Sequence, residues 1–190
     1  MRVSREQAAE NRQRVVATAA RLFRERGFDG IGIADLMREA GLTHGGFYGQ
    51  FGSKEELMAE AVATTLEQSL QRWHERAARH PEDPLGAVVQ AYLRPAHRDG
   101  PGAGCGFAAL ASELGRQPKS LRRRLTDTLR GFFDMLGDQI GGKTATARRK
   151  HGIHAYSAMV GALVLSRIAE DEELSREILA TVAEAITTRQ

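Results

Sequence analysis

Apolar residues recur along most of this chain at intervals of three and four positions, which is the period of an α-helix. The first such stripe lies on Val15, Ala19, Leu22 and Phe23. The most regular stripe follows Pro118 and runs through Leu121, Leu125, Leu129, Phe132, Phe133, Leu136 and Ile140. No alternating run of apolar and polar residues exceeds a few positions, so no strand is predicted. The pattern therefore predicts an all-α protein of nine helices.

Glycine and proline residues indicate where these helices end. The stretch Pro95–Gly106 holds four glycines and two prolines in twelve residues, which predicts a loop. Ser53, with Glu56 three residues later, forms a capping-box pattern at the start of a long helix. The composition changes near Gly52, and we therefore expect two units, residues 1–52 and residues 53–190.

Three short helices predicted in the first unit fit a helix-turn-helix motif. The turn spans Glu39–Thr43, where small residues allow two helices to approach and the chain to bend. The third helix would cover Thr43–Phe51, with Thr43 as its N-cap and with Phe47 and Phe51 on its inner face. Three glycines in this segment disfavour a helix by about 1 kcal/mol each relative to alanine. They also leave an outer face with little bulk, which suits close approach to the major groove of DNA.

The segment Ala20–Glu60 resembles the tetracycline-repressor (TetR/AcrR) family of bacterial transcription factors. The matching positions are Leu22, Phe23, Gly27, Phe28, Ala40, Gly41, Leu42, Thr43, Gly45, Phe47, Tyr48, Phe51, Lys54 and Leu57. The resemblance implies a homodimer that binds double-stranded operator DNA, with the third helix of each subunit in a major groove. It implies a regulator rather than an enzyme.

The resemblance also implies roles for single residues. Tyr48 and Lys54 would contact phosphate, while Thr43 would cap the recognition helix and touch phosphate. His44 and Gly46 would face base edges. The full set of expected DNA contacts is Thr43, His44, Gly45, Gly46, Tyr48, Gln50 and Lys54. Gln50 replaces the usual His or Tyr, and Gly32 replaces the Ser or Thr that usually caps the second helix.

For residues 53–190 the resemblance implies a ligand cavity within helices four to eight. It also implies a dimer interface in the last two helices, here about residues 150–188, where Gly161 and Ala162 favour close packing of another helix. Candidates to line the cavity are Trp73, Tyr92, Phe107, Leu110, Phe133, Met135, Tyr156 and Met159. An aromatic and methionine lining with few charges suits an apolar or planar small molecule. Its entry would shift the helix carrying Leu57–Trp73 and release DNA, as in a repressor.

The charge of the chain is informative mainly through its placement. The formal net charge is +3, but residues 1–26 hold seven Arg against three Glu. This basic first helix would form either a second phosphate-facing surface or a merely solvated face. The run Arg122–Arg124 matches the solvated face of an amphipathic helix. No stretch approaches 18 apolar residues and the N-terminus has no signal-peptide core, so we expect a cytoplasmic protein with no membrane partner.

Three features leave other functions open. The segment Gly137–Thr144 matches the phosphate-loop pattern of nucleotide-binding enzymes, although the residues before it have helical rather than strand spacing. His151 and His154 have the spacing of two metal ligands, but no third ligand lies nearby in the sequence, and we expect no metal and no cofactor. Cys105, the single cysteine, excludes a disulfide within the chain. It is either a redox or electrophile sensor at a helix N-terminus or a small buried apolar residue.

Overall fold

A computed structural model describes residues 4–188. Over this range the chain forms nine α-helices and two short 3-10 turns and contains no strand, which confirms the predicted all-α class. The α-helices are α1 (Arg5–Arg26), α2 (Ile33–Glu39), α3 (Lys54–Arg79), α4 (Pro84–Tyr92), α5 (Pro95–Asp99), α6 (Gly106–Leu114), α7 (Lys119–Ile140), α8 (Ala145–Ile168) and α9 (Glu172–Thr187), and the 3-10 turns are η1 (His44–Gly46) and η2 (Pro101–Ala103).

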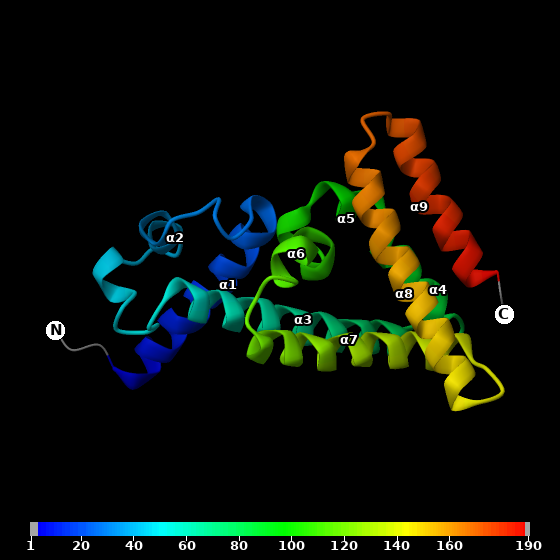
Figure 1. The fold of residues 1–190 in the computed structure, drawn as a ribbon, viewed down its shortest axis with the longest axis horizontal. Helices are drawn as coiled ribbons and strands as arrows, with labels where there is room; N and C mark the ends of the chain where they lie inside the picture. Colours follow the sequence, from blue (N-terminus) through cyan, green and yellow to red (C-terminus); the bar gives the residue numbers. More distant parts are fainter. Residues whose placement is uncertain (1–3, 189–190) are drawn as a thin grey trace.

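The helices form an elongated molecule whose two ends are built differently (Figure 1). At one end α1 and α2 pack together with η1, and at the other end α8 and α9 pack side by side. Between these ends α3 and α7 run alongside each other. Because α3 packs against α1 as well as against α4 and α7, one continuous helix connects the two ends.

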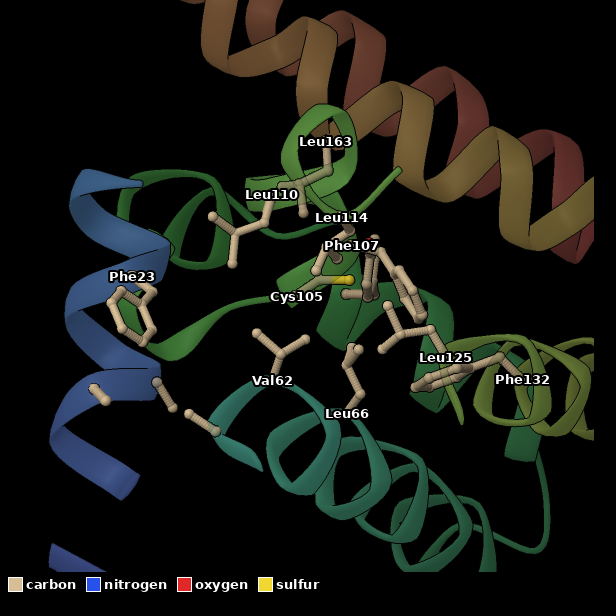
Figure 2. Close-up of a cluster of buried hydrophobic side chains, with 14 of the residues drawn as sticks. Phe23, Val62, Leu66, Cys105, Phe107, Leu110, Leu114, Leu125, Phe132 and Leu163 are labelled. Carbon is tan, nitrogen blue, oxygen red and sulfur yellow. The ribbon is translucent and has the colours of Figure 1, made fainter. Parts of the chain in front are cut away.

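The buried apolar residues form one cluster that crosses the expected division of the chain. Phe23 of α1, Val62 and Leu66 of α3 and Phe132 of α7 all belong to it (Figure 2). The expected boundary between residues 52 and 53 falls at the turn before α3. The two units share this core, and their separation into residues 1–52 and 53–190 stays a prediction.

Several helices begin at side chains that accept hydrogen bonds from the first turn, as the sequence predicts. The Ser53 hydroxyl accepts from the backbone N–H of Glu56 at 3.1 Å, and the Glu56 carboxylate accepts from the backbone N–H of Gly52 at 2.9 Å. Gly32 occupies the N-cap of α2 with extended backbone and offers no side chain there. The start of α3, which carries the expected DNA contact Lys54, is therefore fixed by local hydrogen bonds.

Small residues allow the long helices to cross closely. A Cβ atom at Gly152 of α8 would collide with the carbonyl oxygen of Phe133 in α7. A Cβ atom at Gly131 of α7 would collide with the side chain of Leu70 in α3. The pair α3 and α7 thus has a point of very close approach near the middle of the molecule.

The segment that matches a phosphate loop is a turn between two helices. Gly141 ends α7 with φ of 81°, and the Thr144 hydroxyl caps α8 by accepting from the backbone N–H of Ala147 at 3.1 Å. Gly137 lies inside α7, where a Cβ atom would collide with the backbone of Arg148. Packing and capping account for this pattern, and a helix rather than a strand precedes it.

Two of the predicted elements, one helix and one loop, differ from the structure. The expected third helix, Thr43–Phe51, is the 3-10 turn η1 followed by further turns, because its three glycines cannot sustain an α-helix of this length. The expected loop Pro95–Gly106 contains the short helix α5 and the turn η2. In both of these, proline occupies the first turn, where its missing N–H costs no hydrogen bond. The count of nine helices is met, but with α5 in place of the third.

Candidate DNA-binding surface and effector pocket

Two buried aromatic residues hold the segment after α2 against the core. Phe47 is fully buried and Phe51 is 2% exposed, and their ring centroids lie 5.5 Å apart. The backbone between them follows a helix-like path, since the N–H of Phe51 donates to the carbonyl of Phe47 at 2.9 Å and the N–H of Phe47 donates to that of His44 at 3.1 Å. This anchoring, rather than helix propensity, gives residues 43–51 their conformation.

The opposite side of this segment presents most of the residues that the sequence singles out. Thr43, His44 and Gly45 are exposed, and Tyr48 is 63% exposed, which is unusual for so large an aromatic residue. The rings of His44 and Tyr48 lie edge-on at 6.0 Å. Lys54 follows at the first residue of α3 and is half-buried. The structure thus leaves Thr43, His44, Gly45 and Tyr48 exposed on one short segment, while Lys54 lines a hollow with Phe28 and Glu113.

Two of the predicted roles change. Thr43 stands at the N-cap of η1, but its hydroxyl accepts no capping hydrogen bond, so the expected cap is wrong. The side chain of Gln50 turns inward, where its amide nitrogen donates to the Gly46 carbonyl at 3.1 Å and its amide oxygen is buried. Gln50 is therefore occupied within the segment, and its amide is not offered to a ligand outside.

Arg12 is a structural residue that the sequence pattern did not identify. Its guanidinium donates to the backbone carbonyl of Gln50 and to the carboxylate of Glu60, and it lies over the ring of Phe51 at 4.1 Å. These contacts hold α1 and α3 against residues 43–51, which are called the recognition segment below. A charge count along the chain gives no signal for this role, because the partners lie 38 and 48 residues away.

The basic first helix uses several of its arginines inside the molecule. Arg21 pairs with Glu25 and Glu39, and Arg24 donates to the backbone carbonyl of Gly102 in η2. Arg5, Arg14 and Arg26 remain exposed, and Arg2 lies outside the described residues. The excess of positive charge in residues 1–26 therefore supplies tertiary contacts as well as surface charge. The arginines at 122–124 are exposed, as the amphipathic pattern of α7 predicts.

A pocket of about 310 Å³ lies between α3, α4, α5 and the segment that leads into α6. Trp73 and Tyr92, two of the predicted ligand contacts, line it together with Cys105. The other six candidates lie outside its lining and pack elsewhere, namely Phe107, Leu110, Phe133, Met135, Tyr156 and Met159. The expectation of few charges is wrong for this pocket, because Arg72, Arg76, Arg79, Arg94 and His97 also line it.

Two of the remaining candidates, Phe107 and Tyr156, pack against other aromatic rings in the core. The rings of Phe132 and Tyr156 stack at 4.9 Å, and Phe107 meets both of them edge-on. Trp73 joins the same group, with its ring 4.9 Å from Phe132 and 5.4 Å from Tyr92. Trp73 therefore has one side in the core and another at the pocket.

Cys105 and His97 form the inner corner of the pocket. The backbone N–H of Cys105 donates to His97 Nε2 at 2.9 Å, and His97 Nδ1 lies 2.6 Å from the carbonyl of Tyr92. Burial lowers the pKa of His97 below its usual value. Both ring contacts fit a neutral imidazole that donates from Nδ1 and accepts at Nε2. Figure 2 shows the Cys105 sulfur within the cluster of buried apolar side chains, and it lies 3.8 Å from the Tyr156 hydroxyl.

The rim of this pocket is bonded to both ends of the molecule. Arg24 of α1 holds Gly102, and Arg167 of α8 donates to the carbonyls of His97 and Arg98 at 2.9 and 3.0 Å. From the far end of α6, the Glu113 carboxylate accepts from the backbone N–H of Phe28 at 2.8 Å. Contacts therefore run from the pocket to the helix-turn-helix unit through η2 and α6.

The face of α8 that points away from the core carries exposed apolar side chains. Ile153, Leu165 and Ile168 are 41%, 56% and 73% exposed, and Leu174 of α9 is 46% exposed. Gly161 lies between them with open space where a Cβ would be. Such a patch on one helix face is typical of a surface that another protein covers.

Neither His151 nor His154, the two histidines with metal-ligand spacing, meets further metal ligands in the described residues. His151 Nδ1 lies 2.8 Å from the carbonyl of Gly141, and both His151 and His154 are exposed. Across residues 4–188, no group of three or more His, Cys, Asp or Glu side chains is placed to hold a metal ion. Within that same range, no helix combines the length and the apolar character needed to cross a membrane.

Comparison with known proteins gives consistent results. A family model described as bacterial regulatory proteins, tetR family, matches residues 15–61. The chain is 33% identical over 99 residues to the transcriptional regulator TtgR of Pseudomonas putida, a match that covers 50% of this chain and 45% of that relative's length. It is 24% identical over 193 residues to the transcriptional repressor NemR of Escherichia coli, which covers 94% of this chain and 95% of NemR.

Solved structures show the same fold over nearly the whole chain. A TetR transcriptional regulator from Chloroflexus aurantiacus superposes with a TM-score of 0.77 at 25% identity, covering 97% of this chain and 98% of the other. The reduced form of Escherichia coli NemR superposes with a TM-score of 0.75 at 23% identity, covering 93% and 97%.

Proposed function

The chain is a member of the TetR/AcrR family of transcriptional regulators, and we propose on this premise that it is a repressor that binds a palindromic operator as a homodimer. A small molecule in the pocket beside α3 would release it from DNA. The observation that carries the proposal is the exposed surface of Thr43, His44, Gly45 and Tyr48, held from behind by two buried phenylalanines.

The chemistry of this surface suits a DNA backbone and groove. Tyr48 offers a hydroxyl and Lys54 an ammonium group at the edge of the segment, where phosphates would lie. The glycines leave the centre of the surface without bulk, so the backbone can approach base edges closely. Arg12 holds the segment in place from inside and would not contact DNA.

The apolar face of α8 supports a second copy of the chain as the dimer partner. A two-fold interface places the same patch of each subunit against its counterpart, so the exposed Leu165 and Ile168 would cover each other. Gly161 would allow the two helices to approach closely. A dimer presents two recognition segments, which fits an operator with two related half-sites.

Selection of bound sequences from a random DNA pool tests the proposal. We expect enrichment of a palindrome whose half-site spacing reflects the dimer. The double variant Tyr48→Ala, Lys54→Ala should weaken binding to all sequences and lower the salt slope by about 1, since only Lys54 carries a charge, while Arg123→Gln on the exposed face of α7 should leave both unchanged. Enrichment of no sequence would refute the proposal. An unchanged salt slope would refute the Lys54 phosphate contact, and an unchanged operator affinity would refute both phosphate contacts.

We propose a second route of control through Cys105, because its thiol lines the pocket. The thiol is buried but lines the cavity, so an electrophile small enough to enter could form a covalent bond with its sulfur. We expect Cys105→Ser to abolish DNA release by N-ethylmaleimide and to leave release by a non-covalent ligand intact. If the Ser variant still responded to N-ethylmaleimide, Cys105 would not be the sensor.

A further inference from the structure

The pocket beside α3 carries more positive charge than its packing explains. Arg72, Arg76, Arg79 and Arg94 line it, and Glu75 is the one acidic residue of the described lining. Within residues 4–188 none of these four guanidinium groups lies within ion-pairing distance of a carboxylate, whereas Arg12, Arg21 and Arg98 all do. Arg72, Arg79 and Arg94 are exposed and Arg76 is half-buried, so their charges face the solvent at the pocket without a carboxylate partner.

This arrangement disfavours the folded protein by itself. Arg72 and Arg76 are four residues apart on one face of α3, and like charges at this spacing destabilise a helix by a few tenths of a kcal/mol. The effect reaches α1, because burial and then the positive charge of Arg72 lower the pKa of Arg24. A cluster with such a cost and no internal partner indicates a function outside the fold.

Operator DNA cannot be the partner of this cluster. Arg72 lies 18 residues beyond Lys54 on the same straight helix, which at 1.5 Å per residue is roughly 27 Å from the DNA-binding surface. The arginines surround a concave site rather than an extended face. A small anion inside the pocket meets both conditions.

The rest of the lining describes the body of that anion. Trp73, Val88, Ala91 and the ring of Tyr92 provide an apolar wall. The Tyr92 hydroxyl is buried and has no hydrogen-bond partner, which is costly for a polar group and is relieved when a bound molecule supplies one. The volume of about 310 Å³ is at the small end of the range for ligand pockets, roughly 300–1,000 Å³.

We propose that the effector of this regulator is a small organic carboxylate, with its carboxylate held by Arg72 and Arg76 and its apolar body against Trp73 and Tyr92. Guanidinium groups match a planar carboxylate by paired hydrogen bonds, and aromatic rings suit a compact ring or short chain. Binding would neutralise the charge that repels Arg24. It would thereby act on the contact between Arg24 and Gly102, which joins α1 to the pocket rim. The claim that the carboxylate controls DNA binding rests on the proposed function, whereas its binding to the pocket can be tested without DNA.

Trp73 is the single tryptophan of the chain and lines this pocket, so its fluorescence can follow binding there. The full-length protein is titrated with cyclohexanecarboxylate and benzoate, and with the neutral amides of the same shape. We expect saturable changes in Trp73 emission with the two acids and at least tenfold weaker binding of the amides. Equal affinity for acids and amides would overturn the proposal. So would the absence of a saturable change in Trp73 emission with either acid at concentrations up to about 10 mM.

Two substitutions locate the contacts. Arg76→Gln should weaken binding of the acids by about tenfold or more, the range for loss of a charged hydrogen bond, with Arg123→Gln as the matched control outside the pocket. Tyr92→Phe should leave the melting temperature of the free protein unchanged or higher, since it removes an unpaired hydroxyl, and it should keep the apolar wall for the body of the acid. Unchanged acid affinity in Arg76→Gln would overturn the assignment of the anion site.

DNA release is measured separately on a selected operator. An acid that binds at Trp73 but does not release DNA would count against the proposed ligand control and leave the pocket chemistry intact. Failure of the acids to bind, with operator binding intact, would overturn the carboxylate proposal alone.

Discussion

Alanine at Gly45 and Gly49 should stabilise the free protein and weaken its binding to DNA. Nothing lies within 4 Å of a Cβ atom at Gly45, and the nearest atom to one at Gly49 is 3.8 Å away. Neither glycine has a positive φ, so alanine fits both without strain. Each substitution should add about 0.4–1 kcal/mol by restricting the unfolded chain. For a chain of this length the double variant should melt about 2–8 °C higher.

Gly41→Ala is the matched control in the same motif. Gly41 has φ of 70°, a conformation that costs a residue with a Cβ atom about 1–2 kcal/mol, so this variant should melt at a lower temperature. Thermal melts at one fixed protein concentration compare the double variant and Gly41→Ala with the wild type. On a selected operator, the two new methyl groups of Gly45→Ala, Gly49→Ala should hold the segment away from the groove and lower affinity by about tenfold or more.

The two measurements refute different steps of the reasoning. A double variant that melts below the wild type would mean that residues 43–51 do not have the free outer face described above. A double variant that is more stable and binds the operator unchanged would mean that the glycine face does not meet the groove.

Three further expectations follow from the structure. Arg12→Gln should destabilise the fold by about 1–3 kcal/mol in urea unfolding, because it breaks charged hydrogen bonds to the recognition segment and to α3; a loss below 0.5 kcal/mol would contradict its structural role. Leu165→Glu should convert a dimer to a monomer in analytical ultracentrifugation, and a persistent dimer would exclude this face of α8 as the interface. Burial lowers the pKa of His97, so the unfolded chain binds that proton more readily, and the stability from neutral His97 is present above about pH 6.5 and lost as the pH falls below it. His97→Gln should therefore flatten the dependence of melting temperature on pH between 7 and 5.5, and an unchanged slope would contradict the neutral form.

The sequence predicts the helix-turn-helix unit well because its signals are local. The buried Phe47 and Phe51 and the capping box at Ser53 follow from spacing within a few residues, whereas the outward-facing Tyr48 follows from the family resemblance. The third helix fails for a local reason too, since three glycines weaken it more than the motif suggests. Thr43, His44, Gly45 and Tyr48 are nevertheless exposed, because tertiary anchoring of Phe47 and Phe51 replaces helix propensity.

The pocket could not be read from the sequence because it depends on which faces of distant helices meet. Tyr156 and Phe107 look like ligand contacts in a list of bulky residues, yet Tyr156 stacks on Phe132 and Phe107 meets it edge-on, so both pack in the core. Arg72 and Arg76 look like surface charge, and only the approach of α4 and α5 turns them toward a cavity. Arg12 is similar, because its partners are close in space and distant along the chain.

The side chain of Leu70 in α3 packs over Gly131 of α7, and this contact divides α3 into two parts of unequal length. From Leu70 to Lys54 the arm is 16 residues, roughly 24 Å, and from Leu70 to Arg79 it is nine residues, roughly 14 Å. If α3 tilted about this contact and Arg79 moved by about 2 Å, Lys54 would move by about 3.5 Å. This distance is close to one base-pair step along the duplex. In a two-fold dimer residues 43–51 of both subunits would shift. A ligand would then change the distance between these two segments, and with it the half-site spacing that the dimer fits.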